Sequence, residues 1–257
     1  EDLSFDMARL VGVVRPKIVI YENVKGLTME YAADHFKKIV NAFEEHGYQS
    51  VNRVLNANDY GVPQGRERVF VIGVRDDILP HGLALNWAFP TPIDNRPTMR
   101  DAIWDLRNDD ENLVEHEELM GEMKKQKRWK YLSEMPIDVE KFVQIDHYVF
   151  DGMTKEKELD PYAPEPKLSG FQVRRVPWDK PSHTLSERGL QIGTCAHLHP
   201  GEHRGFTPLE ARRIMSLPSD YHLDGTTNEK LARIGLMVAP LQMKALAEIV
   251  YNQYLRG

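Results

Sequence analysis

A carboxylate stands where an apolar run gives way to polar residues, and it is the first candidate for acid–base chemistry. Residues 17–21 read Lys-Ile-Val-Ile-Tyr and lead directly into Glu22, Asn23 and Val24. The carboxyl end of a strand is where α/β proteins usually bind ligands, and a carboxyl group held there can share a proton with one. Glu22 could instead cap a loop through hydrogen bonds, and the residue alone leaves both interpretations open.

Two arginines and a glutamine form the second candidate group. Gln64, Arg66 and Arg68 alternate with other residues immediately before an apolar run, so a strand would place all three on one side. Polar side chains on a buried side need partners, and arginine offers a planar, permanently charged set of donors for carbonyl or phosphate oxygens. The alternative is a surface ion pair of an arginine with Glu67 or Asp59.

The segments around Glu22 and around Gln64–Arg68, together with Asn-Asp-Tyr-Gly-Val-Pro at 58–63 directly before Gln64, resemble the DNA (cytosine-5) methyltransferases. That family uses a Glu-Asn-Val and a Gln-x-Arg-x-Arg element to hold a flipped target cytosine. The resemblance implies that a thiolate adds to C6 of the base and that a carboxyl group, suitably one with a raised pKa, stabilises charge at N3. It implies Glu22 as that catalytic carboxyl, Arg68 near O2 of the base and Arg66 as support for the catalytic loop.

The resemblance also implies that the chain binds double-stranded DNA at a specific sequence. Residues 174–184 carry Arg, Pro and Thr at the family's spacing, where they hold the target-recognition region against the catalytic core. The basic stretch 124–130 could contact phosphates, although the acidic run before it favours a solvated charged helix. The DNA-binding residues that we predict are Asn23, Gln64, Arg128, Lys130, Arg174, Arg175 and Thr184.

Residues 235–240 lie where the family has Gly-Asn-x-Val-x-Pro, which lines the cofactor pocket. The resemblance therefore implies S-adenosylmethionine as the cofactor, with Leu236, Met237 and Val238 in contact with it and most of its site outside this chain. Leu236 stands in place of the family's Asn and offers neither a donor nor an acceptor. Without the family, the same residues indicate a turn before a helix that Pro240 begins.

The family's nucleophilic cysteine, in a Pro-Cys loop, and its Gly-rich cofactor loop both precede Glu-Asn-Val, and the residues before Glu22 contain neither. Cys195, the only cysteine, follows a threonine and lies far beyond Glu22. Its close spacing to His197, His199 and His203 is unlike that of a zinc site, so we predict no metal. We expect the C-terminal part of a methyltransferase, inactive alone, which needs a missing N-terminal part or a complementary subunit.

Apolar spacing predicts the elements that carry these residues. Residues 4–14 have the spacing of a helix that Pro16 ends, and 18–21 form an apolar run typical of a buried parallel strand. The other expected elements are helices at 29–46, 98–106, 115–132, 208–216 and 240–255, with Gly47 and Thr207 as caps, and strands near 49–56 and at 69–74. The order strand–helix–strand–strand is typical of the closing part of a doubly wound sheet.

The predicted fold class is α/β: part of a Rossmann-like S-adenosylmethionine-dependent methyltransferase sheet plus an irregular target-recognition region. We divide the chain into the C-terminal half of the catalytic core (1–78), the target-recognition region (79–205) and helices returning to the core (206–257). A sheet this small leaves the strand at 18–21 with an open apolar edge, so we expect another segment or subunit to pair with it.

Composition narrows the class of protein without deciding its function. The chain has 257 residues, 41% of them hydrophobic, which suffices for one or two packed domains. One cysteine excludes a disulfide framework, no apolar run reaches the length of a membrane span, and we expect the cytoplasm of a bacterial or phage-infected cell. The net charge of −6 argues against binding nucleic acid over the whole surface. The alternatives are an inactive methyltransferase-like protein that binds DNA or a partner, and an RNA cytosine methyltransferase.

Overall fold

The computed structural model describes residues 2–79, 87–125, 136–140, 143–146, 172–187 and 197–256. These residues belong to two compact units. Unit 1 comprises residues 1–56, 67–92 and 243–257, and unit 2 comprises residues 57–66 and 93–242. The short segment 57–66 thus belongs to a different unit from the residues on either side of it, a division unlike the expected boundaries at 78 and 205.

A three-stranded sheet forms the centre of unit 1. Strands β1 (Ile18–Val24), β4 (Glu67–Arg75) and β2 (Tyr48–Asn56) lie in the order β1-β4-β2, and β4 is antiparallel to both neighbours. The expectation of a parallel pairing for 18–21 is wrong, because β4 returns in the opposite direction and inserts between β1 and β2. An apolar run without alternation indicates cover on both faces rather than strand direction, and β4 is buried throughout 69–74.

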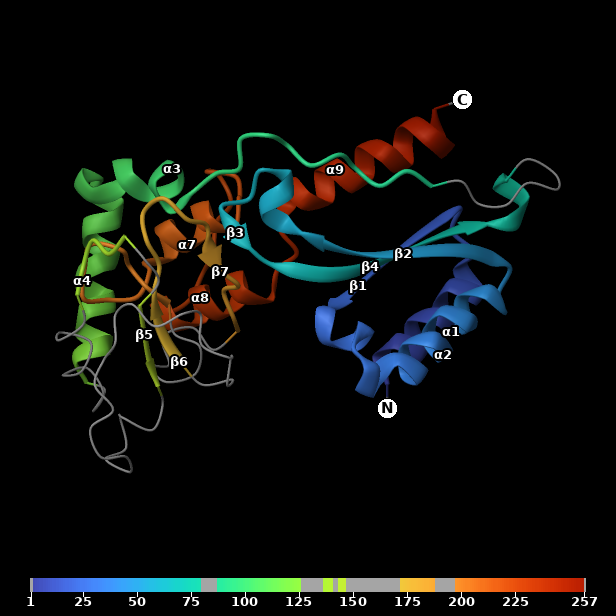
Figure 1. Ribbon diagram of the computed structural model, residues 1–257, viewed down its shortest axis with the longest axis horizontal. Helices are drawn as coiled ribbons and strands as arrows, with labels where there is room; N and C mark the ends of the chain where they lie inside the picture. The colour runs from blue at the N-terminus through green and yellow to red at the C-terminus, as the bar shows by residue number, and fades with distance from the viewer. Residues whose placement is uncertain are drawn as a thin grey trace. The chain divides into compact units, whose positions relative to one another are not determined.

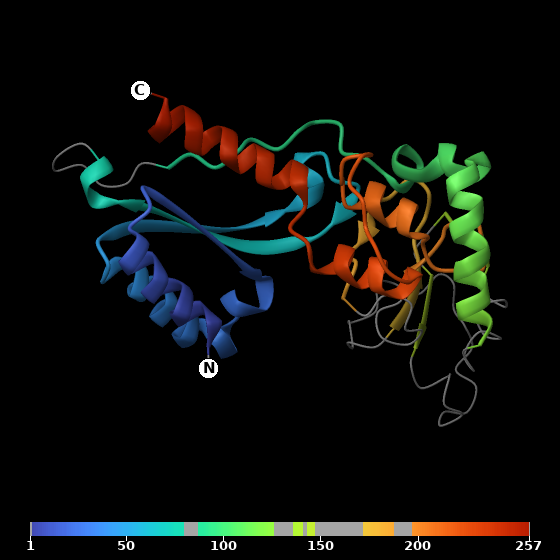
Figure 2. The ribbon, with the colours of Figure 1, turned by 180° about the vertical axis from the view of Figure 1, so that it is seen from behind.

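Helices cover both faces of this sheet. Helices α1 (Leu3–Val14) and α2 (Ala33–Glu44) lie on one side, and α9 (Pro240–Val250) lies on the other from Met243 on (Figures 1 and 2). Two short 3-10 helices, Lys25–Thr28 and Glu30–Ala32, precede α2, so the helix predicted at 29–46 is shorter than expected. The cluster beneath α1 and α2 comprises Ala8, Val11, Val19, Tyr21, Ile39, Phe43, Tyr48 and Val71.

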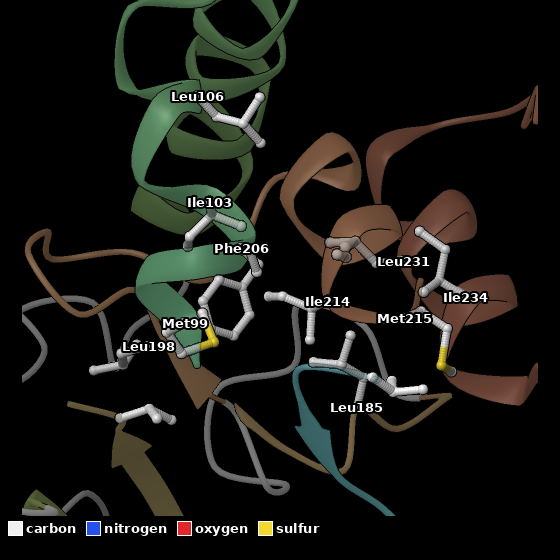
Figure 3. Close-up of a cluster of buried hydrophobic side chains, with 14 of the residues drawn as sticks. Met99, Ile103, Leu106, Leu185, Leu198, Phe206, Ile214, Met215, Leu231 and Ile234 are labelled. Atoms are coloured by element: carbon white, nitrogen blue, oxygen red, sulfur yellow. The ribbon is translucent and has the colours of Figure 1, made fainter. Parts of the chain in front are cut away.

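The described residues of unit 2 include four α-helices around one core. These helices are α3 (Met99–Ile103), α4 (Asp110–Lys124), α7 (Pro208–Ile214) and α8 (Thr227–Leu236). Figure 3 shows Ile103, Ile214, Leu231 and Ile234 of these helices meeting, together with Leu106 of the 3-10 helix Trp104–Asn108 that follows α3. Strand β3 (Gln64–Gly65) pairs in parallel with β7 (Ser182–His183), and a separate small sheet contains β5 (Val143–Asp146), β6 (Gln172–Arg175) and β8 (His197–Leu198).

Capping boxes begin three helices of unit 2. Thr98, Thr207 and Thr226 each accept a hydrogen bond from the backbone N–H three residues on, and the carboxylate there bonds back to the cap. The cap predicted at Thr207 is therefore confirmed. Helix α8 is absent from the sequence-based expectation, although Thr226 and Glu229 have the spacing of a capping box.

A buried ion pair joins the loop before α7 to that helix. The Arg204 guanidinium donates to both carboxylate oxygens of Glu210, at 2.7 and 2.8 Å, and both side chains are buried. His199 lies beside the pair, with Nε2 3.7 Å from a Glu210 oxygen, and burial lowers the pKa of His199 to about 4. Buried charges are tolerated only when paired in this way, so the loop and α7 depend on each other.

Residues 227–255 are long and apolar enough, by length and composition alone, to cross a membrane. The most apolar window has a mean hydropathy of 1.3, so the expectation that no run reaches this length is wrong. The segment is nevertheless two helices, because residues 237–239 are not helical. Ile234 in α8 and Leu246 in α9 are fully buried, whereas only 33% of the most apolar window is buried as a whole.

Candidate active site

Glu22 and Arg68 lie side by side on neighbouring strands of unit 1. The register pairs Glu22 of β1 with Phe70 of β4, and Val24 with Arg68. Opposed residues of antiparallel strands project to the same face, so Glu22 and Arg68 are diagonal neighbours on one face. Arg68 Nε lies 3.1 Å from Glu22 Oε1, and the two side chains are 15% and 23% exposed, respectively. The structure thus brings together the two groups predicted to hold a base, while their catalytic role stays a prediction.

The carboxylate of this pair retains hydrogen-bonding capacity. Glu22 Oε1 is buried and has no hydrogen-bond partner among the described residues, because its approach to Arg68 is an ion pair without hydrogen-bond geometry. Arg68 Nη1 donates to the carbonyl of Glu67 at 2.8 Å, which holds the guanidinium against the strand. An acceptor beside a guanidinium is complementary to a heterocycle that presents a donor next to an acceptor.

Asn23, predicted to contact DNA, is turned toward the opposite face of the sheet. Its Nδ2 donates to the Tyr21 hydroxyl at 2.5 Å, and its Oδ1 accepts from Val24 N at 2.8 Å. The Tyr21 hydroxyl also lies 3.0 Å from Ser4 Oγ on α1. Asn23 is partly exposed, and each of its two amide atoms can make one further hydrogen bond beyond these. No sequence signal marks this role of Tyr21, because a tyrosine inside an apolar run indicates core.

Gln64 and Arg66 are buried within unit 2. Gln64 Oε1 accepts from Leu185 N at 3.2 Å, and its Nε2 points to Met215 Sδ at 3.7 Å. Arg66 Nη1 donates to the carbonyls of Leu185 and Gly235, at 3.3 Å each. These bonds connect β3 to the segment after β7 and to the end of α8. Because Gln64 has no exposed surface, a direct contact with DNA would require unit 2 to open there.

The expectation that one strand carries all three polar residues of this motif is wrong. Gln64 is in β3, which pairs with β7, whereas β4 begins at Glu67, after Arg66. Unit 2 holds Gln64 and Arg66, and unit 1 holds Arg68. Side chains alternate only within a continuous strand, so the shared side predicted for these residues does not exist.

Arg174 and Arg175, also predicted to bind DNA, differ in exposure. Arg175 is fully buried, and its guanidinium donates to the carbonyls of His199 and Glu202. Burial lowers the pKa of Arg175 to about 10, because the low-polarity surroundings disfavour its charge. Arg174 is partly exposed. Of the two neighbours, Arg175 therefore holds the loop around residues 199–202, and Arg174 is the one with surface available to a ligand.

Of the remaining polar residues predicted to bind DNA, the structure describes only Thr184. Thr184 Oγ1 donates to the carbonyl of Gly65 at 3.5 Å, beside the β3–β7 pair. Arg128 and Lys130 lie outside the described residues, and so does Cys195. Within the described part of the chain, no group of three or more His, Cys, Asp or Glu side chains is arranged to hold a metal ion.

The predicted cofactor-lining residues stand at the end of α8. Leu236 is the last helical residue and is 68% exposed, Val238 is also exposed, and Met237 packs against the core of unit 2. Gly235 is buried, and a Cβ built there would lie 2.1 Å from the carbonyl oxygen of Ser186. The side chains of 236–238 fit a cofactor only through apolar contact, because none of them is a hydrogen-bond donor.

A comparison of the whole chain with protein families agrees with these motifs. The family model for the C-5 cytosine-specific DNA methylases matches residues 1–252. The match extends over both compact units and over all the motifs discussed above. The chain belongs to the C-5 cytosine-specific DNA methylase family, and the membership predicted from the two motifs is confirmed.

Curated relatives of this chain include type II methyltransferases of bacteria. M.PspPI of a Psychrobacter species is 30% identical over 244 residues, which are 91% of this chain and 53% of that protein. M.Eco47II of Escherichia coli is 30% identical over 243 residues, with the same two shares. M.XorII of Xanthomonas oryzae is 31% identical over 258 residues, which are 93% of this chain and 59% of that protein. The chain therefore spans about half the length of the first two relatives.

Solved structures support the α/β fold class. A prophage-encoded protein of E. coli, described as a DNA modification methyltransferase, superposes with a TM-score of 0.65 at 18% identity and covers 98% of this chain and 74% of its own. The Dnmt2 methyltransferase of S. pombe superposes with a TM-score of 0.51 at 14% identity, covering 97% of this chain and 71% of its own. At these identities the likeness shows the fold alone, and the predicted α/β methyltransferase fold is confirmed.

Proposed function

We propose that this chain is the base-binding and target-recognition part of a DNA cytosine-5 methyltransferase that acts on a flipped cytosine. The observation that carries the proposal is the ion pair of Glu22 and Arg68, with its buried, unsatisfied carboxylate oxygen. Cytosine presents an amino donor and a ring acceptor beside a carbonyl, which is the pattern that a carboxyl group and a guanidinium match.

In the proposed reaction, the chain's own residues hold the base and stabilise charge on it. Glu22 would share a proton with N3 and accept a hydrogen bond from the exocyclic amine. Arg68 would donate to O2, so that charge developing on the ring after attack at C6 is stabilised from two sides. S-adenosylmethionine would supply the methyl group, and Leu236, Met237 and Val238 would contact it through apolar surface. The nucleophile and the cofactor loop would come from outside these 257 residues.

A partner segment that completes the sheet is part of the proposal. Within the described sheet β1 is an edge strand that pairs only with β4. On α1, Leu3, Leu10 and Val14 recur at helical spacing and are largely exposed. An open strand edge and an exposed apolar helix face in one unit favour a second segment, in the same polypeptide or another, that continues the sheet. The similarity to type II methyltransferases of bacteria supports restriction–modification in the bacterial cytoplasm as the setting.

A second candidate is a methyltransferase-like protein that binds DNA without transferring methyl groups. The observation that favours it is Leu236, because its exposed apolar side chain offers no polar contact to a cofactor. The unsatisfied carboxylate oxygen of Glu22 is compatible with both candidates, since a base held there would satisfy it with or without methyl transfer. An RNA cytosine methyltransferase would share the base pocket and differ in the nucleic acid that it prefers.

Methyl transfer by the completed enzyme tests the proposal. The chain is co-expressed with the polypeptide that carries the Pro-Cys and Gly-rich sequences, and methyl incorporation into duplex DNA and into RNA is measured. We expect transfer to DNA by the complex and none by the chain alone, and Glu22→Ala should lower turnover by roughly 100-fold or more, about 2.7 kcal/mol. The control is Glu45→Ala, which removes an exposed carboxylate from unit 1 and should leave turnover unchanged. Transfer by the chain alone, or a Glu22→Ala effect below about tenfold, would contradict the assigned roles.

A further inference from the structure

The hydroxyl group of Tyr21, the residue before Glu22, is within hydrogen-bond distance of two other side chains. Tyr21 is buried, its ring lies 5.9 Å from that of Phe43, and its hydroxyl accepts from Asn23 Nδ2 at 2.5 Å. The same hydroxyl lies 3.0 Å from Ser4 Oγ, so α1, β1 and the residue after Glu22 meet at one oxygen. Nothing in the proposed chemistry uses this oxygen directly.

This hydroxyl lies on the opposite face of the sheet from the proposed base-binding pair. Tyr21 belongs to the cluster under α1 and α2, and successive side chains of a strand point to opposite faces. Glu22 therefore projects to one face, while Tyr21 and Asn23, the residues on either side of it, are bonded together on the other. A link between residues i−1 and i+1 fixes the backbone of residue i.

We infer that Tyr21 is a positioning residue for Glu22, acting through Asn23. This inference rests on the proposed function, in which Glu22 holds the base. The hydroxyl orients the Asn23 amide, whose Oδ1 then accepts from Val24 N at 2.8 Å. Together these bonds set the backbone of residues 21–24, and with it the direction of the Glu22 side chain.

The end of β1 has few other constraints among the described residues. Its backbone pairs with β4 on one side only. The adjoining ion pair, Lys25 Nζ with Glu67 Oε2 at 2.8 Å, has side chains that are 41% and 44% exposed, so water screens it and it contributes little. Apart from the Glu22–Arg68 ion pair itself, the hydroxyl of Tyr21 is therefore the main side-chain anchor of this strand end among the described residues.

The test replaces Tyr21 by Phe and compares it with a matched variant, Tyr48→Phe. Tyr48 is buried in the same cluster, and its hydroxyl donates to the carbonyl of Pro16 at 2.6 Å. Each variant thus removes one buried hydroxyl and at least one hydrogen bond. Only the hydroxyl of Tyr21 is hydrogen-bonded to Asn23, the residue after Glu22. In the completed enzyme we expect Tyr21→Phe to lower kcat by about 10- to 100-fold, because misplacing a reacting group has effects of that size. The KM for the cofactor should change less than about twofold, and Tyr48→Phe should leave kcat unchanged.

Hydrogen exchange on the chain itself gives a readout that does not depend on activity. The amide of Val24 should exchange faster in Tyr21→Phe than in the wild type, and Tyr48→Phe should leave its rate unchanged, because only the first variant releases Asn23. If the wild-type complex transfers no methyl group, the proposed function fails and the inference fails with it. If the wild type is active but the two variants have equal kcat or equal Val24 exchange, the inference alone is overturned.

Discussion

A methyl group added at Gly235 should severely destabilise unit 2. This glycine is buried in the last turn of α8, and a Cβ there would lie 2.1 Å from the carbonyl oxygen of Ser186, well inside van der Waals contact. The obstacle is backbone rather than a flexible side chain, so either the helix end or the segment after β7 must shift. The same shift would pull the Gly235 carbonyl away from Arg66 Nη1, which donates to it at 3.3 Å.

The size of the effect follows from these two contacts. Overpacking in a rigid site costs about 1–3 kcal/mol. Loss of a buried hydrogen bond from a charged donor costs about 1.5–3 kcal/mol. Gly235→Ala should therefore lower the free energy of unfolding by about 3–5 kcal/mol and the melting temperature by roughly 10 °C. Helix propensity acts in the opposite direction, since alanine is favoured over glycine inside a helix by only about 1 kcal/mol.

Gly121→Ala is the matched control for this prediction. Gly121 lies inside α4, also in unit 2, and a Cβ there would meet no atom within 4 Å. This variant should gain about 0.5–1 kcal/mol, because alanine loses less conformational freedom than glycine on folding. Urea unfolding of both variants is followed by far-UV circular dichroism and by tryptophan fluorescence. A loss below about 1 kcal/mol in Gly235→Ala would refute the close packing of α8 against Ser186.

Two further predictions concern the buried charges near α7. His199 has a pKa of about 4 in the folded protein, below the value of about 6.5 expected when unfolded, so the unfolded state binds the extra proton. The contribution of His199 to the free energy of unfolding should therefore be fully present above about pH 6.5. As the pH drops toward about 4, the free energy of unfolding should fall by up to about 1.4 kcal/mol per pH unit. In His199→Asn this part of the slope should vanish, and an unchanged slope would exclude His199 as its source. Arg204→Met should cost about 3–5 kcal/mol in urea unfolding, because Glu210 would remain buried and charged without its partner. Arg213→Met breaks a more exposed pair with Asp105 and should cost less than about 1 kcal/mol; equal losses in the two variants would contradict the importance of burial.

The local elements of this protein were accessible to sequence reasoning because their signals are local. Pro16 and Gly47 mark the ends of segments, and Gly47 adopts the positive φ, 80°, expected after a helix. Thr207 and Pro208 begin α7 as the capping pattern predicts. Such signals depend on a few neighbouring residues, so they identify an element without saying what it packs against.

Strand direction and unit membership depended instead on contacts between distant residues. The run at 18–21 predicts a buried strand correctly, but apolar residues on both faces fit an antiparallel neighbour as well as a parallel one. Similarly, nothing in the spacing of 64–68 indicates that β3 pairs with β7, more than 100 residues later, before β4 begins. Only the partner strands decide these pairings, and their sequence separation hides them from local patterns.

The two arginines of the Gln-x-Arg-x-Arg motif show how partners, rather than residue type, determine a role. Arg66 is buried and donates to two backbone carbonyls, so its guanidinium joins segments of unit 2. Arg68, two positions later, faces a carboxylate whose buried oxygen lacks a hydrogen bond. A carbonyl that already accepts a bond from arginine is satisfied, whereas an unsatisfied carboxylate beside a guanidinium favours a polar ligand. This difference in partners agrees with the proposed placement of Arg68 against the base and of Arg66 in a supporting role, which the family resemblance implied.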